Sequence, residues 1–254
     1  MWLLFFTVLG SAVGSFLNVA IDRLPRGQSI VFPPSYCENC QRRLKPWDNI
    51  PVFSFLWLRG RCRYCRMRIS PRILAVEVAT AGLFAFLWWR YGFSIQLLLA
   101  SVYTCAFLVL AVIDLEHKLL LNIIVLPTLA LALLASPFWP GLDIWRALAG
   151  GAIGFVLLLL PRLAFPSGMG WGDVKMAALI GAVTGFPLVF LAIWLALLGG
   201  GLTAVVLLIS RIKGRKDLMP FGPFLAAGAL IALYWGGPLL DKYLELSAAL
   251  FGAF

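Results

Sequence analysis

Long apolar stretches separated by short polar segments make up most of this sequence. A helix needs about 20 apolar residues to cross the roughly 30 Å hydrocarbon core of a bilayer. Once the polar residues 22–72 are set aside, the rest of the chain is long enough for about eight such helices. The pattern therefore predicts an all-α polytopic membrane protein. The expected spans are residues 2–21, 73–91, 95–113, 119–137, 146–163, 174–187, 188–210 and 220–238, with the tail 239–254 in the membrane interface.

Composition supports the membrane class. The chain is 62% hydrophobic and only 13% charged, whereas soluble domains average about 45–50% apolar and about 25% charged residues. A core does not need this excess of apolar residues, so we expect it to face lipid. The same values exclude disordered, collagen-like and disulfide-rich secreted proteins.

The positive charges predict how the chain is oriented. The first cation is Arg23, after the first span, so this span does not resemble a cleaved signal peptide. Eleven of the 21 Lys and Arg residues lie between Arg23 and Arg72. With the N-terminus outside, eight crossings place 18 cations in the cytoplasm, including the cluster 211–216, as the positive-inside rule requires.

Four of the five cysteines form two C-x-x-C pairs, which are 21 residues apart. Two such pairs supply the four thiolates of a closed, tetrahedral zinc site, which has a structural role. The alternatives are disulfides or free thiols, and a cytoplasmic location disfavours disulfides. We therefore predict a structural zinc ion in the segment 22–72. The predicted ligands are Cys37, Cys40, Cys62 and Cys65.

The basic residues around these cysteines leave more than one interpretation open. They offset the negative charge of a zinc–tetrathiolate centre, and they could equally face anionic lipid headgroups. Nucleic-acid binding is the weaker interpretation, and we expect no nucleic-acid partner. The lipid bilayer is the expected environment.

Two aspartates lie at the ends of predicted spans, where an ionisable group is a functional candidate. Asp114 ends the third span and Asp173 begins the sixth, so both are expected on the cytoplasmic side. Two carboxylates that share a proton are the machinery of aspartic proteolysis. Gly170 and Gly172 would let an extended substrate lie close to Asp173. The alternative is that each aspartate only caps a helix, which suits Asp173 better than Asp114.

Other polar residues suggest less chemistry. Glu77, about one turn inside the second span, is expected to form an interhelical hydrogen bond. His117 is the only histidine, and it is expected to be a solvated loop residue. No nucleophile elbow accompanies it, so a serine triad is not indicated.

An ordered set of motifs covers most of the chain. They are Gly14-Ser-Phe-Leu-Asn-Val19, Arg23-Leu-Pro25, Pro33-Pro34, the two cysteine pairs, Asp48-Asn-Ile-Pro51, Leu58-Arg-Gly-Arg-Cys62, Ile69-Ser70, Val76-Glu77, Gly170-Trp-Gly-Asp173-Val-Lys175 and Pro220-Phe-Gly-Pro223. Together they resemble the type IV prepilin peptidase family, whose GxGD motif matches residues 170–173.

The resemblance implies an intramembrane aspartic protease of the bacterial inner membrane, with Asp114 and Asp173 as the catalytic pair. Its substrates would be prepilins or pseudopilins, which are cut after a short basic leader. Because Glu116 lies beside the predicted catalytic site, it is the favoured acidic contact for that leader, with Glu38 and Asp48 as less favoured candidates. Members with the four cysteines commonly also methylate the new N-terminus with S-adenosylmethionine. The implied organisation is a first transmembrane helix (1–21), a cytoplasmic zinc module (22–72) and a peptidase domain (73–254).

The sequence departs from many relatives after the first aspartate. Leu121-Asn122 replaces a Pro-Asp pair, so an uncharged amide stands where those relatives carry an acid. No glycine-rich nucleotide loop marks a methyl-donor site, so methylation rests on the resemblance alone. The competing functions are a transporter or channel with intramembrane acids, and a zinc-ribbon assembly protein without catalysis.

Overall fold

The computed structural model of the chain describes residues 1–164, 169–210 and 219–251. The elements within these ranges are helices, turns and two isolated β-bridges, with no extended strand. The predicted cation cluster 211–216 lies outside the described residues. The all-α class is confirmed.

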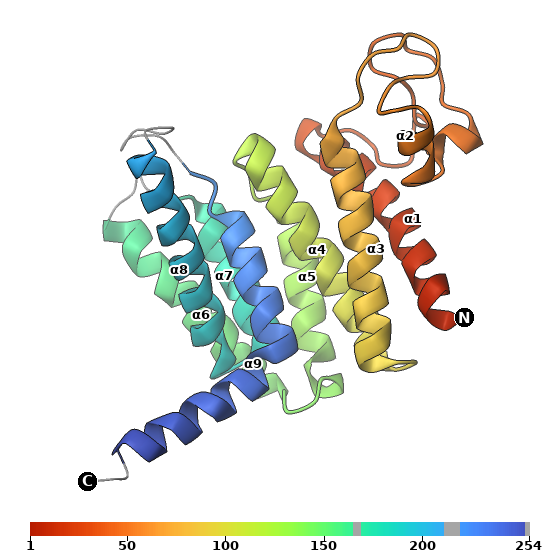
Figure 1. Cartoon of the computed structure of the whole chain (residues 1–254). Helices are drawn as coiled ribbons and strands as arrows, with labels where there is room; N and C mark the ends of the chain where they lie inside the picture. The colour runs from red at the N-terminus through yellow and green to blue at the C-terminus, as the bar shows by residue number, and fades with distance from the viewer. Residues whose placement is uncertain (165–168, 211–218, 252–254) are drawn as a thin grey trace. The chain divides into compact units, whose positions relative to one another are not determined.

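Each predicted span corresponds to a helix (Figure 1). Six helices are long and apolar enough to cross a membrane. They are α1 (Trp2–Arg23), α3 (Pro71–Tyr91), α4 (Ile95–His117), α6 (Ile144–Ala164), α8 (Leu188–Ile209) and α9 (Gly222–Phe251). The other two, α5 (Asn122–Ala135) and α7 (Trp171–Thr184), have 14 residues each, which is a length of about 21 Å.

The chain forms two compact units, Met1–Cys105 and Ala106–Phe254, and the division falls within α4. In the first unit, α1 and α3 are an antiparallel pair that packs through small residues. A Cβ atom added to Gly14 would lie 2.8 Å from Cα of Glu77, and one added to Gly10 would lie 3.0 Å from Cα of Ala81. Glycines four residues apart therefore allow the two backbones to meet, as in membrane helices with a G-x-x-x-G motif.

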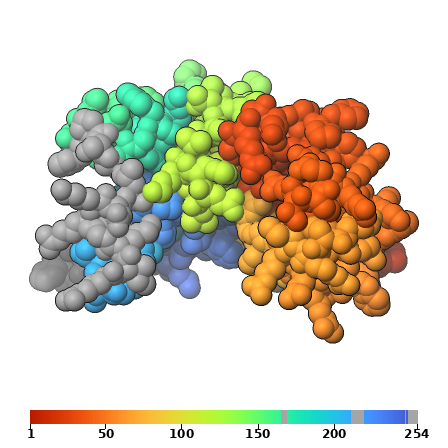
Figure 2. All heavy atoms as spheres, turned by 90° about the horizontal axis from the view of Figure 1, so that it is seen from above, coloured from red at the N-terminus to blue at the C-terminus, as the bar shows by residue number. Residues whose placement is uncertain are grey.

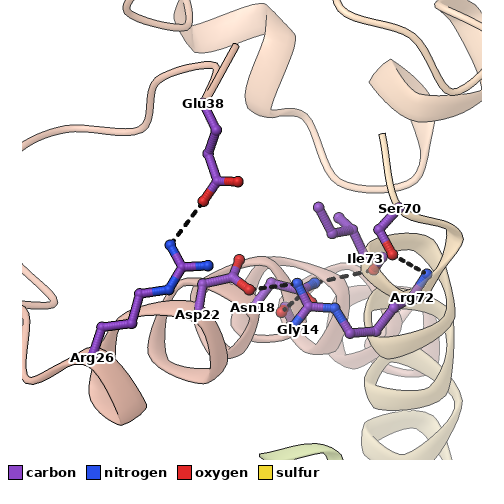
Figure 3. Close-up of polar contacts among 8 residues, drawn as sticks. All are labelled: Gly14, Asn18, Asp22, Arg26, Glu38, Ser70, Arg72 and Ile73. Atoms are coloured by element: carbon purple, nitrogen blue, oxygen red, sulfur yellow. Dashed lines mark hydrogen bonds and ion pairs between the residues drawn. The ribbon is translucent and has the colours of Figure 1, made fainter. Parts of the chain in front are cut away.

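Polar contacts hold the end of this pair from which the cysteine-containing segment emerges (Figure 3). Asn18 donates a hydrogen bond of 3.0 Å from Nδ2 to the carbonyl oxygen of Ile73. Asp22 and Arg72 form an ion pair at 2.7 Å. Seen from above, the orange atoms of the intervening segment lie together at this end of the first unit (Figure 2).

In the second unit, α7 is the buried helix, and it packs against α5, α6, α8 and α9. From Met176 to Thr184 only Ala178 is not fully buried. Helix α7 approaches α6 as closely as backbones allow, because Gly181 lies against Gly150 and a Cβ on Gly154 would be 3.0 Å from the carbonyl carbon of Ala177. A helix that is apolar on every side suits such a position.

Helix α9 extends beyond the predicted span. The sequence predicts that it ends near residue 238, but the helix continues to Phe251 and includes Pro238. It changes direction along its length (Figure 1). A proline inside a helix removes one backbone hydrogen bond and bends the axis, which accounts for the change.

The close approach of α1 and α3 yields a stability prediction. We expect Gly14→Ala to lower the free energy of unfolding by about 1–3 kcal/mol, the usual range for an overpacked contact. The matched control is Gly82→Ala, because Gly82 is also helical but has nothing within 4 Å of an added Cβ atom. Thermal unfolding of both variants in detergent gives the test, and equal midpoints would contradict the packing argument.

Candidate active site and metal centre

Asp114 lies in the last turn of α4 and is only 6% exposed. Its Oδ2 atom accepts a buried hydrogen bond of 2.7 Å from the backbone N–H of Gly222, the first residue of α9. A carboxylate at the C-terminus of its own helix opposes that helix dipole. The N-terminus of α9 supplies the opposite, favourable end of a dipole. The contact explains how an acid is kept in this apolar unit.

Gly222 was not singled out from the sequence, where it is only part of the motif Pro220–Pro223. A Cβ atom at this position would lie 2.8 Å from Oδ2 and 3.0 Å from Cγ of Asp114. Only glycine therefore lets the N–H reach the carboxylate without a clash. The two residues are 108 positions apart, so no local pattern could have paired them.

Asp173 lies in the first turn of α7, and its Oδ2 atom accepts a hydrogen bond of 3.0 Å from the N–H of Gly170. Gly170 is the residue that precedes the helix, so Asp173 satisfies an amide group at the helix N-terminus. Its carboxylate is close enough to that of Asp114 for the two charges to interact. The structure thus brings both predicted acids into one site in the second unit.

The two glycines beside Asp173 differ in what surrounds them. A Cβ atom on Gly172 would lie 2.7 Å from Cβ of Leu120, so this glycine is needed where α7 packs against the chain between α4 and α5. A Cβ atom on Gly170 would be 3.4 Å from Oδ2 of Asp173, an ordinary contact distance. Space next to the carboxylate is therefore found at Gly170.

Several polar residues lie close in sequence to the two aspartates. Lys175 donates a hydrogen bond of 3.1 Å from Nζ to Oδ1 of Asn122, the first residue of α5. The amide at position 122 thus binds the lysine through its oxygen without cancelling the lysine charge. Glu116 and His117 are exposed at the end of α4, close in sequence to Asp114.

The four predicted cysteine ligands form a cluster in the first unit that could hold a metal ion. Their Sγ atoms all lie within 4.8 Å of one another, and those of Cys37 and Cys65 are 3.7 Å apart. Four thiolates at about 2.3 Å from a tetrahedral zinc ion would be separated by about 3.8 Å. A disulfide would need about 2.05 Å, and all four cysteines are free.

The two cysteine pairs occupy equivalent turns. In each turn the residue after the second cysteine, Gln41 or Arg66, has a positive φ and donates a backbone hydrogen bond to the first cysteine. Each turn is also closed by a two-residue bridge, Tyr36 with Arg43 and Arg61 with Arg68. The pKa of the Cys65 thiol is lowered from 9.0 to about 6. The largest cause is a backbone hydrogen bond from Met67, and the second is a hydrogen bond from the side chain of Asn39. A thiolate is the form that binds metal.

Comparisons with known proteins agree with the division of the chain into two compact units, Met1–Cys105 and Ala106–Phe254. Residues 8–91 match the bacterial peptidase A24 N-terminal domain, and residues 101–205 match the type IV leader peptidase family. A Pseudomonas putida protein named prepilin leader peptidase/N-methyltransferase is 36% identical over 267 residues, which cover 94% of this chain and 93% of the relative. A Bacillus subtilis protein of the same name is 36% identical, with 94% and 97% covered. No solved structure matches significantly.

Proposed function

Because the chain belongs to the type IV leader peptidase family, we propose that it removes the short basic leader of prepilins or pseudopilins and then methylates the new N-terminus. Its relatives are named for both activities. The observation that carries the proteolytic part is the pairing of two acids, Asp114 and Asp173, at the meeting point of α4, α7 and α9.

The proposed chemistry needs one proton shared between the two carboxylates. The ionised aspartate takes a proton from water as that water attacks the scissile carbonyl carbon. The protonated aspartate donates its proton to the carbonyl oxygen, which gives a tetrahedral gem-diol. The aspartate that took the proton from water then donates it to the leaving amine as the C–N bond breaks, and the other aspartate takes back a proton from the gem-diol. Each acid is held through Oδ2 by a glycine N–H, which fixes its orientation. No triad or metal-bound water is required for these steps.

The substrate would be held next to this pair. An added Cβ atom at Gly170 would make only ordinary contacts, so the chain is not tightly packed beside the Asp173 carboxylate. We propose that Gly170 and Gly172 shape this part of the substrate path, and that the exposed Glu116 meets the basic leader. The transporter alternative is disfavoured because both acids lie at helix ends on one side of the second unit.

The cysteine cluster would bind one structural zinc ion. The donor set of Cys37, Cys40, Cys62 and Cys65 leaves no position open for substrate, so the ion would fold the segment 22–72 rather than take part in the reaction. Methyl transfer would use S-adenosylmethionine, and we assign no residue to its binding.

The proposed location is the bacterial inner membrane, with the N-terminus outside and with both the zinc module and the aspartates in the cytoplasm. The functional parts would be the first transmembrane helix (1–21), the zinc module (22–72) and the peptidase domain (73–254). The excess of cations expected on the cytoplasmic side supports this orientation. A prepilin substrate and the lipid bilayer are the partners, and nucleic acid is not one.

The catalytic pair is tested by removing one acid at a time. We expect Asp114→Asn and Asp173→Asn each to lower the cleavage rate by about a hundredfold or more, because general acid–base groups contribute about 10²–10⁴-fold. The readout is mass spectrometry of a purified prepilin incubated with the enzyme. Asp143→Asn is the matched control, because Asp143 is exposed and its carboxylate contacts Arg146 in the same turn. Near-normal turnover of either single variant would refute the assignment.

The role of Gly222 is tested by adding one methyl group. We expect Gly222→Ala to slow cleavage at least about tenfold, because a displaced acid no longer meets the reacting atoms. Gly237→Ala is the control, since Gly237 lies in the same helix with open space around it. Both variants should retain wild-type helix content by circular dichroism. An active Gly222→Ala enzyme would show that this contact does not position Asp114.

Metal analysis tests the cysteine site. We expect about one zinc ion per chain in protein purified without chelator, as for other four-cysteine sites. Cys62→Ser should lose the metal, whereas Cys105→Ser should keep it, because Cys105 lies in α4 outside the cluster. A metal-free wild-type protein, or equal metal content in the two variants, would contradict the zinc site.

A further inference from the structure

A short stretch of the cysteine-containing segment exposes large apolar side chains to its surroundings. It consists of the one-turn helix α2 (Phe53–Trp57) and the preceding 3₁₀ helix (Pro46–Asn49). In α2, Phe53, Leu56 and Trp57 are 58%, 60% and 71% exposed. Their spacing of three and four residues places them on one helix face. Trp47 and Ile50 are also exposed just before α2, and we call these five residues the α2 surface.

A partly buried hydrogen bond fixes the level of α2 along the helix pair. The N–H of Val52, just before α2, donates to Oε2 of Glu77 at 2.7 Å. Glu77 is only 4% exposed and lies six residues after the start of α3 at Pro71. Six residues correspond to about 9 Å along a helix axis. The start of α2 is therefore held beside the first turns of α3, no more than about 9 Å from the end of this membrane-spanning helix.

The backbone at this link is constrained. Val52 has φ 63° and ψ −53°, a positive φ that β-branched residues rarely adopt. On the inner side, Phe55 packs against Gly60, where an added Cβ would lie 3.0 Å from the phenylalanine ring. The segment thus turns one aromatic residue inward and keeps Phe53 and Trp57 outward, with their rings stacked at 5.8 Å.

The charge around the α2 surface is strongly positive. The three acids between residues 22 and 72 each form an ion pair, in the pairs Asp22–Arg72, Glu38–Arg26 and Asp48–Arg63. The same range contains eleven Lys and Arg residues against these three acids, so its net charge is +8. Arg59 and Arg61 directly follow α2 and are exposed, and the ammonium group of Lys45 lies 5.2 Å from the Trp47 ring.

We propose that the α2 surface inserts into the bilayer interface beside α1 and α3, and that Arg59 and Arg61 bind the headgroups of anionic phospholipids. Interfacial helices bury an apolar face about 5–10 Å into the headgroup boundary, which is the level set by Glu77. Tryptophan side chains favour the level of the interface next to the hydrocarbon, and arginine side chains extend to the charged headgroups. The α2 surface offers both kinds of side chain. The segment 22–72 is then fastened to the membrane at α2 as well as through its two spanning helices. This anchoring does not depend on the peptidase function.

A protein partner is the other occupant that such a surface could have. The depth of α2 favours lipid, because a soluble partner would have to enter the space beside two spanning helices. An anionic bilayer also supplies the complementary charge over the whole basic segment.

Hydrogen exchange of the full chain in nanodiscs tests the proposal. Four amides donate backbone hydrogen bonds within α2 or next to it, those of Ser54, Leu56, Leu58 and Gly60. A helix as short as α2 is not stable alone in water. We expect these amides to exchange about fivefold more slowly in equimolar phosphatidylcholine and phosphatidylglycerol than in phosphatidylcholine alone. Fivefold corresponds to the about 1 kcal/mol that one cation gains near an anionic surface.

Three variants separate the contributions. Trp57→Ser should speed exchange of these amides in both lipids, because it removes apolar contact. Arg59→Gln should remove most of the difference between the lipids. Arg66→Gln is the matched control, because Arg66 is exposed in the second cysteine turn. This variant changes the net charge by the same amount as Arg59→Gln. The amides of Gln41 and Arg66, which close the two cysteine turns, should be unchanged in Trp57→Ser and Arg59→Gln and report that the segment is folded.

Several outcomes would overturn the inference. Equal exchange of the α2 amides in the two lipid mixtures would exclude headgroup binding. Equal effects of Arg59→Gln and Arg66→Gln would show that bulk charge, and not this surface, responds to the lipid. Protection in detergent micelles equal to that in anionic nanodiscs would show that protein contacts alone hold α2, and protection gained only on adding a soluble protein would assign the surface to that partner.

Discussion

The hydrogen bond from the Gly222 amide to the Asp114 carboxylate joins parts of the chain that lie 108 residues apart, and the candidate active site depends on it. The bond is buried, so losing it would leave both a charged acceptor and an amide donor without compensation in an apolar unit. It also places the end of α4 against the start of α9, next to the first turn of α7. Asp173 is held in the same way by the N–H of Gly170, so each acid is fixed by a backbone group, whose position varies less than that of a side chain.

Close helix packing makes such backbone contacts available. Helices in a bilayer gain little from the hydrophobic effect on associating with each other, so they rely on intimate van der Waals contact. In the second unit this contact is made by Gly150 and Gly154 against Gly181 and Ala177, and in the first unit by Gly10 and Gly14 against α3. These glycines thus set the distances between the helices that they join.

The sequence predicted the parts of the fold and site that stand out locally. Asp114 and Asp173 could be predicted because they interrupt apolar stretches. The metal ligands could be predicted because the spacing of the two C-x-x-C pairs is visible in the sequence. The membrane class followed from composition and run length. A short sixth span, residues 174–187, was predicted from the sequence, and α7 has the same length of 14 residues. The short length of α5 could not be predicted this way, because a helix buried by other helices is as apolar as one that faces lipid.

Contacts between distant residues were not accessible from the sequence. Glu77 was expected to form an interhelical hydrogen bond, and it does so with the side chain of Ser15 in α1; its carboxylate also accepts a hydrogen bond from the backbone of Val52 in the loop before α2, which was not predicted. Gly172 was expected to make room for substrate, and the structure adds a packing reason for it, the contact with Leu120. In each case the partner is a backbone atom or an aliphatic group, which leaves no chemical signature in the sequence.

The shortness of α7 has a geometric consequence for the chemistry. Its closest pairings with α6, Gly181 with Gly150 and Ala177 with Gly154, place Asp173 level with Leu158. Helix α6 continues for six more residues to Ala164, which is about 9 Å. Asp173 therefore lies well inside the end of its neighbour, while Asp114 is three residues from the end of α4. An acid recessed in this way can reach a peptide bond next to an apolar transmembrane segment without drawing that segment out of the bilayer. A full-length α7 would instead carry its first turn to the membrane surface, where water already hydrates both the acid and the peptide bond.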